Sequence, residues 1–243
     1  MTYELFGRLA ERYDWHTPPH HYQHDHAFVL SQLPGPPCRV LDVGCGTGVF
    51  LEKAVAAGFD VTGLDASAEM VSIASKRVGT EYVHVGRMQD INERCAYDGI
   101  VSLSWSFNYV SSFEEAREVL GLFFEALRPG GRLILQIAHA ANATGALNED
   151  REPGPDGDAD DVLFLYRFHR VPERRGGLRA QYVYGCKSRK ELLFEEHQLS
   201  AADVYTVAEQ VSAVGFKNVV MLNSWRGESL DQSVSAFLLA ARP

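Results

Sequence analysis

The residues best suited to chemistry form a glycine-rich turn in the stretch VLDVGCGTG, residues 40–48. Asp42 precedes Gly44 and Gly46, and the turn separates a short apolar run from a helix-like segment. Glycines there let the backbone approach a ligand closely, and the N-terminus of the following helix favours polar or anionic groups. Asp65 ends the next apolar run, where a doubly wound nucleotide site places a carboxylate for ribose hydroxyls. We expect a nucleotide-type ligand at this turn.

The elements that position this turn alternate between strand and helix patterns. Strands are predicted at 39–44, 59–65, 81–86, 97–105 and 132–139, helices at 50–58, 68–79 and 112–131. The chain closes with a predicted helix at 201–215 and strands at 216–222 and 233–243. This alternation predicts an α/β fold with one doubly wound, mostly parallel sheet and helices on both faces. Ligands of such sheets bind at the carboxyl ends of the strands.

Residues 148–199 interrupt the alternation. The stretch 148–161 carries seven acidic residues, which is typical of a mobile surface loop. Three β-type runs follow, at 162–170, 178–187 and 191–199, and predict a small inserted antiparallel sheet. We therefore expect a single domain over 1–243, divided into an N-terminal helical lid (1–36), a ligand-binding core (37–147 and 200–243) and an insertion (148–199).

The N-terminal segment is rich in aromatic residues at roughly helical spacing. Residues 1–15 predict an amphipathic helix, and a second helix is predicted from about His20 to Leu33, after Pro18 and Pro19. The first helix has no fixed partner in the strand–helix alternation. We therefore expect residues 1–22 to close over the site as a lid when ligand binds.

Several of these features together resemble one family. VLDVGCGTG with Asp65, the strand YDGIVSLSW and the ending LRPGGRLILQI are similar to the class I S-adenosylmethionine-dependent methyltransferases over about residues 38–139. The resemblance implies a seven-stranded sheet with an antiparallel last strand and S-adenosyl-L-methionine as cofactor. The cofactor-binding residues it implies are Tyr22, Asp42, Gly44, Gly46, Asp65, Ala66, Met70, Met88, Ser104 and Trp105. Arg87 stands where many relatives have an acidic residue for the adenine amino group, so Asp90 or a backbone carbonyl is expected to replace it.

A subgroup of the family is also suggested. FGRLAERYDW and the inserted sheet resemble bacterial natural-product N-methyltransferases that act on nucleotide-linked amino sugars, in which Tyr13 and Tyr22 belong to the lid. Tyr109, in SFNYV, is expected to point toward the acceptor, and Tyr13 or His139 to accept its proton. An O-methyltransferase with His139 or His24 as base, and a cofactor-binding protein without activity, remain alternatives.

Composition and charge limit the kinds of partner that the protein is expected to have. A net charge of −9 opposes nucleic-acid binding, and no apolar run approaches the ~20 residues that cross a bilayer. Four cysteines without a C-x-x-C pair, and a charged N-terminus, favour a cytoplasmic protein with reduced thiols. The small-molecule acceptor is therefore the expected partner, together with a second copy of the chain, because a two-faced aromatic sheet exposes one face.

The histidine cluster at 16–26 leaves its role open. His20 and His24 have the i, i+4 spacing of metal ligands, but no H-E-x-x-H motif or cysteine accompanies them. Methyl transfer from a sulfonium needs no metal, so we expect no metal site. A metal site, a contact to acceptor or cofactor, and a plain surface helix are the three interpretations.

Overall fold

The main sheet has seven strands and confirms the predicted fold class. The computed structural model describes residues 3–154, 160–230 and 232–243. The strands lie in the order β10-β11-β5-β4-β1-β2-β3. Their bounds are β1 Arg39–Val43, β2 Asp60–Asp65, β3 Val83–Val85, β4 Tyr97–Ser102, β5 Leu127–Ala138, β10 Lys217–Leu222 and β11 Ser235–Ala241. Only β11 runs antiparallel to its neighbours, β5 and β10.

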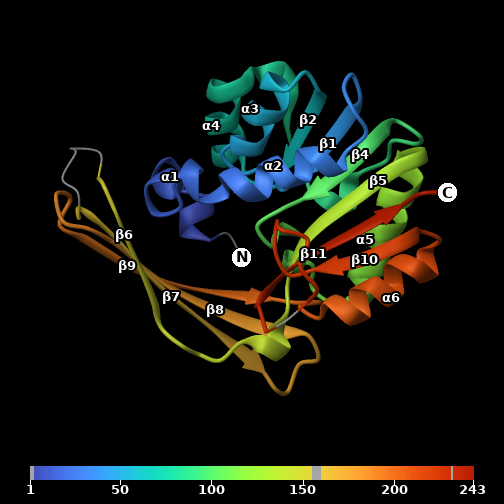
Figure 1. Cartoon of the computed structure of the whole chain (residues 1–243). Coiled ribbons are helices and arrows are strands. Elements are labelled where there is room, and N and C mark those ends of the chain that lie inside the picture. The colour runs from blue at the N-terminus through green and yellow to red at the C-terminus, as the bar shows by residue number, and fades with distance from the viewer. Residues whose placement is uncertain (1–2, 155–159, 231) are drawn as a thin grey trace.

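Helices cover both faces of this sheet (Figure 1). Their bounds are α2 Gln23–Gln32, α3 Val49–Ala56, α4 Ala68–Val78, α5 Phe113–Ala126 and α6 Val204–Val214. Helices α2, α3 and α4 pack on one face through Val29, Leu51 and Ala74, whereas α5 and α6 pack on the other. None of the helices in the described residues is long and apolar enough to cross a bilayer. The predicted helix at 112–131 ends earlier, at Ala126, because Leu127 already pairs with Tyr97 in the sheet.

The insertion forms a separate antiparallel sheet of four strands instead of the three predicted. The strands are β6 Asn148–Glu152, β7 Val162–Val171, β8 Gly177–Cys186 and β9 Glu191–Leu199, in that order. Strand β6 comes from the acidic stretch that was expected to be a loop; the rest of that prediction falls partly on residues 155–159, outside the described residues. Charged residues are well suited to β6 because it is an edge strand, where charge opposes further pairing.

Alternation along β7 and β8 places five aromatic side chains on one face of this inserted sheet. These are Phe164, Tyr166, Phe168, Tyr182 and Tyr184, whose rings contact one another in a continuous layer. Phe194 lies on the opposite face, where it pairs in register with Val183 and is 60% exposed. The aromatic layer therefore forms the inner face of the sheet.

The N-terminal segment packs on this inner face. It consists of the short helical turns η1 Glu4–Phe6, η2 Ala10–Arg12, α1 Tyr13–His16 and η3 Pro19–Tyr22, so the prediction of one helix over residues 1–15 is wrong. Leu5 and Leu9 are buried against Phe164 and Tyr184. The carboxylate of Glu195, on β9, accepts hydrogen bonds from the backbone N–H groups of Glu4 and Leu5.

The expectation that this segment has no fixed partner is therefore also wrong. Its partner is the inserted sheet, which the strand–helix alternation of the core could not indicate. The short turns suit this packing, because each turn directs its apolar residues onto the aromatic layer without requiring a single straight axis.

Truncating Leu5 tests how firmly the segment is docked. Residues 5–16 should exchange their amide hydrogens slowly before any ligand is added, and Leu5→Ala should speed that exchange by about 30-fold. This corresponds to about 2 kcal/mol, the lower end for truncating a buried leucine. Leu192→Ala, on the exposed face of the same sheet, is the control and should leave this exchange unchanged. Fast exchange in the wild-type protein without ligand would contradict the docking.

Candidate active site

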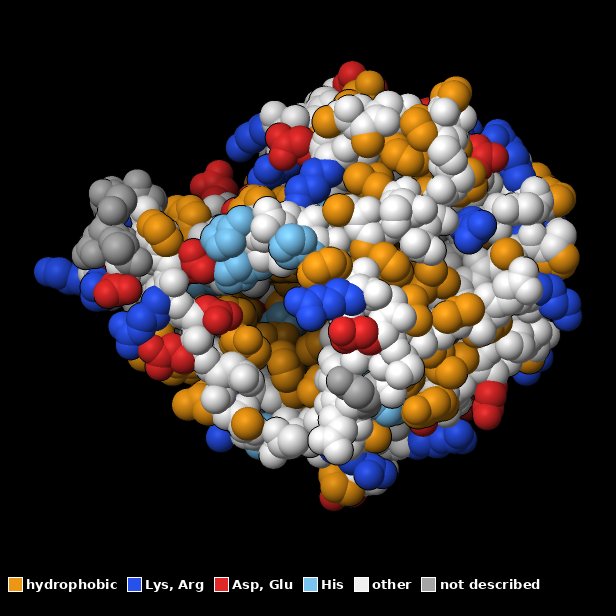
Figure 2. Space-filling model, viewed as in Figure 1, with side chains coloured by type: hydrophobic (Ala, Val, Ile, Leu, Met, Phe, Trp, Pro, Cys, Tyr) orange, Lys and Arg blue, Asp and Glu red, His pale blue; other side chains and the backbone are white. Residues whose placement is uncertain are grey.

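A cavity of about 620 Å³ lies at the carboxyl ends of β1, β2 and β4, beneath the N-terminal segment. Most of the predicted site residues line it: Tyr13, Tyr22, Asp42, Gly44, Gly46, Asp65, Ala66, Met70, Met88, Ser104 and Tyr109. The surface on the viewed side is hollowed between the core and the inserted sheet, with apolar side chains inside and histidine, acidic and basic side chains around the rim (Figure 2). The cavity therefore joins the two parts of the fold.

The glycine turn forms the floor of the cavity. Gly44 has a φ of +78°, and a Cβ there would lie 2.4 Å from the Cβ of Ser106, so only glycine fits. Gly46 also has a positive φ, of +54°, but the space where its Cβ would stand is empty. This backbone is therefore open to close contact with a ligand in the cavity.

Asp65 holds the turn and faces the same cavity. One carboxylate oxygen accepts a hydrogen bond from the Gly46 N–H and the other from the Ser67 N–H, both at 2.9 Å. Burial raises the pKa of Asp65, and these two hydrogen bonds oppose that rise because they favour the charged form. Each oxygen keeps a second lone pair with which it can accept a hydrogen bond from a ligand hydroxyl.

Asp42 lies beside Asp65 at the end of β1 and is 2% exposed. Burial and the nearby charge of Asp65 raise the pKa of Asp42 to about 8. Two carboxyl groups so close and so poorly hydrated disfavour two negative charges. A positively charged ligand group in the cavity would relieve this repulsion.

The side of the cavity nearest β3 is lined by Ala66, Met70, Met88 and Arg87. Asp90, the expected substitute for an acidic residue at position 87, instead accepts a hydrogen bond from the Arg87 N–H and so caps its own short turn.

Aromatic residues form the roof. Tyr13 and Tyr22 come from the N-terminal segment and Tyr109 from η6, Ser106–Tyr109, and all three line the cavity. Burial holds the pKa of Tyr13 and of Tyr109 well above 10, so both are neutral phenols at physiological pH. Tyr3 and Phe6 add two further rings, which sequence analysis did not assign to the site.

A polar network joins this roof to the glycine turn. Asp14 accepts a hydrogen bond from the hydroxyl of Thr47, at 2.7 Å, and pairs with the guanidinium of Arg77, at 2.5 Å. Arg77 also donates to the Thr47 carbonyl and pairs with Glu52 on α3. The N-terminal segment is thus attached at both sides of the cavity, to the core here and to the inserted sheet through Glu195.

A row of three polar side chains behind Tyr109, joined by one hydrogen bond and one ion pair, was missed by sequence analysis. The Tyr109 hydroxyl lies 2.6 Å from Nδ1 of His197, and Nε2 of His197 lies 3.3 Å from a Glu195 oxygen. His197 is 1% exposed and Glu195 8%. Burial raises the pKa of Glu195, but hydrogen bonding and charge from His197, together with the N–H groups of Glu4 and Leu5, lower it below its usual value.

The sequence ELLFEEHQL indicated part of this arrangement, because strand alternation puts the side chains of Glu195 and His197 on one face. The facing partner, Tyr109, comes from a loop of the core, and no local pattern reveals that meeting.

Two predicted residues lie outside the cavity lining. The Trp105 indole donates a hydrogen bond to the Ser235 hydroxyl and packs against Phe168. His139 is buried behind β5, where its Nδ1 accepts a hydrogen bond from the Val204 N–H at the start of α6. Trp105, predicted to bind the cofactor, is thus held by packing and a hydrogen bond, and His139, predicted to be catalytic, caps α6; neither lines the cavity.

The histidines of the cluster at 16–26 lie in different surroundings. His24 stacks on Trp225, whereas His26 is buried, lines the cavity and has its pKa lowered to about 3 by burial and by Lys53. The i, i+4 spacing of His20 and His24 is therefore not accompanied by a contact between their rings in the described residues.

Comparison with known proteins agrees with this geometry. Residues 40–131 match the family model described as a methyltransferase domain. A dTDP-3-amino-3,4,6-trideoxy-alpha-D-glucopyranose N,N-dimethyltransferase of Streptomyces venezuelae is 34% identical over 97 residues, 40% of this chain and 41% of that protein. A malonyl-[acyl-carrier protein] O-methyltransferase of Pectobacterium atrosepticum is 33% identical over 146 residues, 60% of this chain and 54% of that protein. The chain spans about half the length of the curated relatives it matches.

Solved structures extend the likeness to the whole fold. CalS10, described as an amino pentose methyltransferase from Micromonospora echinaspora with SAM bound, superposes with a TM-score of 0.70 at 20% identity. The match covers 97% of this chain and 94% of CalS10, including the region of the inserted sheet. Residues 40–131 are therefore similar to a methyltransferase domain, and the chain as a whole has the fold of this solved methyltransferase structure.

Proposed function

We propose that this chain transfers a methyl group from S-adenosylmethionine to the amino nitrogen of a nucleotide-linked sugar. The cavity built from the glycine turn and Asp65 is the observation that carries the cofactor half of this proposal. The acceptor half is supported by the relative that dimethylates a dTDP-linked amino sugar and by the likeness to an amino pentose methyltransferase.

The residues present fit the cofactor. Asp65 has one free lone pair on each oxygen for the two ribose hydroxyls, and the open face of Gly46 admits the methionine part close to the backbone. Met70 and Met88 line the same cavity and offer apolar contacts to adenine, and a cationic neighbour would favour the charged form of the Asp42 carboxyl. S-adenosylmethionine supplies an electrophilic methyl group on a positively charged sulfur.

The protein's own task is to hold the acceptor in line with that methyl group and to keep water out. Tyr13 and Tyr22 close the cavity from the N-terminal segment, and Phe6 extends this cover toward Tyr109. The segment is anchored to both the core and the inserted sheet, so these contacts hold the cover in place over the cavity.

We propose that the side chains of Tyr109, His197 and Glu195 together remove the proton from the acceptor amine. An attacking amine must lose one proton, which the Tyr109 oxygen accepts as its own hydroxyl hydrogen passes to Nδ1 of His197. The imidazolium so formed lies 3.3 Å from the Glu195 carboxylate, which stabilises its charge. Tyr109 ends as a neutral phenol, in keeping with its raised pKa.

The outer face of the inserted sheet is proposed to pair with a second copy of the chain. Two rows of apolar residues cross it in register, Leu163–Gly185–Leu192 and Leu165–Val183–Phe194. Leu192 is 75% exposed, and a polar row of Arg167, Gln181 and Glu196 borders the patch. An apolar patch with a polar border is typical of an interface, and two-fold pairing is the commonest arrangement.

Acceptor choice is the first test of the proposed function. Purified protein and S-adenosylmethionine should add one or two methyl groups to the amine of a nucleotide-linked amino sugar, detected by mass spectrometry. The matched sugar with a hydroxyl in place of the amine, and glycine, are the control acceptors. Methylation of the hydroxyl sugar alone would replace the proposal with an O-methyltransferase, and cofactor binding without any transfer would reject an enzymatic role.

Asp65→Ala should weaken S-adenosylmethionine binding by about 1.5–3 kcal/mol, because a charged acceptor of two hydrogen bonds is lost. Calorimetry measures the dissociation constant, with Asp60→Ala at the exposed start of the same strand as the control. An unchanged dissociation constant in a folded Asp65→Ala protein would show that the ribose binds elsewhere.

Tyr109→Phe should lower kcat by about 100-fold, the low end of what a positioned acid–base group contributes, with little change in cofactor affinity. His197→Gln should lower kcat as well. The double variant should be no slower than Tyr109→Phe alone, because both groups serve the same proton transfer. Tyr205→Phe, an exposed tyrosine on α6, is the control. Additive effects of the two variants would contradict the proton route.

Phe194→Glu should convert a dimer into a monomer, because it places a charge within the apolar patch. Sedimentation velocity at micromolar concentration measures the change. Val220→Glu, at an exposed position on β10, is the matched control and should leave the dimer intact. A wild-type protein that sediments as a monomer would remove the proposed interface.

A further inference from the structure

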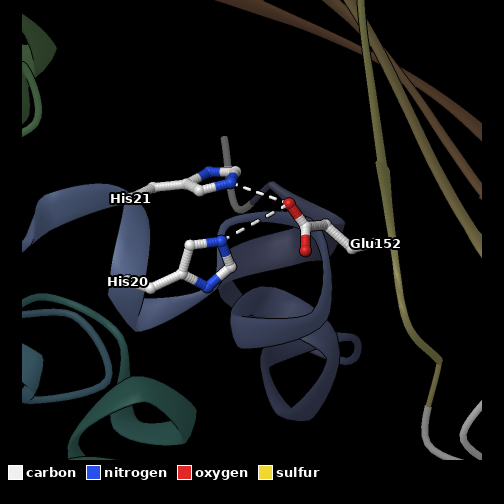
Figure 3. A group of neighbouring side chains, drawn as sticks. All are labelled: His20, His21 and Glu152. Carbon is white, nitrogen blue, oxygen red and sulfur yellow. Dashed lines mark hydrogen bonds and ion pairs between the residues drawn. The ribbon is translucent and has the colours of Figure 1, made fainter. Parts of the chain in front are cut away.

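Three side chains outside the cavity lining meet where the N-terminal segment crosses the inserted sheet. His20 and His21 lie on η3, and Glu152 is the last residue of β6. Nε2 of His21 lies 2.8 Å and Nε2 of His20 3.7 Å from the same oxygen of Glu152. Figure 3 shows both imidazole rings directed at that carboxylate from one side.

The local backbone explains how neighbouring histidines can converge. Pro19 starts the tight turn of η3, and the two rings stand nearly perpendicular, at 82°, with centroids 4.5 Å apart. Each ring therefore presents one nitrogen to the same point without stacking on the other. The ligand atoms of His20, His21 and Glu152 all lie within 4.8 Å of one another.

The carboxylate of Glu152 is directed at the two rings. Its side chain is only 14% exposed, and in the part of the chain that the structure describes its ion-pair partners are these two histidines alone. The three ligand atoms therefore face one common point, at which a divalent cation could contact all of them.

We propose that His20, His21 and Glu152 bind one divalent ion of the zinc class. Two imidazole nitrogens and one carboxylate oxygen form the three-ligand set of zinc sites that keep a fourth position for water. Magnesium and calcium prefer all-oxygen ligands, so the donor set selects against them. The site is made by tertiary contact between residues 131 positions apart, which is why the i, i+4 pattern of His20 and His24 did not reveal it.

Such an ion would tie the N-terminal segment to the edge strand of the inserted sheet. Tyr22, which lines the cavity, follows His21 directly on η3, so an ion at this point fixes the backbone that presents Tyr22. Binding to the folded arrangement alone would stabilise it by mass action. This role is structural and does not depend on which acceptor is methylated.

The test uses the full chain with any affinity tag removed. Calorimetry with Zn²⁺ should give one equivalent per chain and a raised Tm, and Co²⁺ should give the visible absorption of a low-coordinate nitrogen–oxygen site. His21→Ala and Glu152→Gln should each weaken binding by at least about 10-fold, since even loss of groups that only orient metal ligands has that effect. His24→Ala, an exposed histidine outside the group, is the matched control and should bind as the wild type does.

Each variant should melt like the wild type when no metal is present, which separates loss of a ligand from loss of folding. The proposal would be overturned if both folded variants bound Zn²⁺ with the affinity of the wild type. It would also be overturned if the wild-type protein bound less than one equivalent of Zn²⁺ per chain. The readout is binding and stability, so an inactive enzyme or an unexpected acceptor leaves the test valid.

Discussion

The buried carboxylate of Glu195 is the constraint on which the upper half of the active site depends. A charge that is 8% exposed must be compensated, and two parts of the chain contribute to this: the backbone at Glu4 and Leu5, and the ring of His197. Satisfying that one carboxylate holds the N-terminal segment on the inserted sheet. The same carboxylate contacts His197, whose other ring nitrogen faces Tyr109, so it joins the roof to the proposed proton route.

The floor of the site follows a different principle and was open to prediction from sequence. The glycine turn, Asp65 and the strand ends that carry them are fixed by local rules, namely which backbone angles glycine permits and where parallel strands end. Gly44 must lack a Cβ because Ser106 stands against it, and the Ser67 hydroxyl caps α4 by accepting a hydrogen bond from the Met70 N–H. Met70 and Met88, which the resemblance to the family implied, line the same cavity.

The roof was not open to prediction in the same way, because its parts meet only in three dimensions. Residues 1–15 have helical spacing, yet they form short turns whose apolar residues fit the aromatic layer of β7 and β8. His139 has the right residue type at the right strand end, but capping of α6 by its Nδ1 turns it away from the cavity. His197 and Glu152 lie in strands whose register with the core no sequence period specifies. Tertiary contact therefore overrode local pattern at each of these positions.

The N-terminal segment is attached to the inserted sheet more than to the strands of the core. This attachment limits how proteins with this fold can change the acceptor side of the site. Under the proposed function, the acceptor side of the site comes from two separate stretches, the N-terminal segment and the inserted sheet, whereas the cofactor side is nearly continuous. A chimera that exchanges the insertion alone would leave Leu5, Leu9 and the Glu4 backbone facing a foreign surface. New acceptor specificity is therefore expected to arise by paired change in these two distant stretches, and grafting experiments should transplant them as one unit.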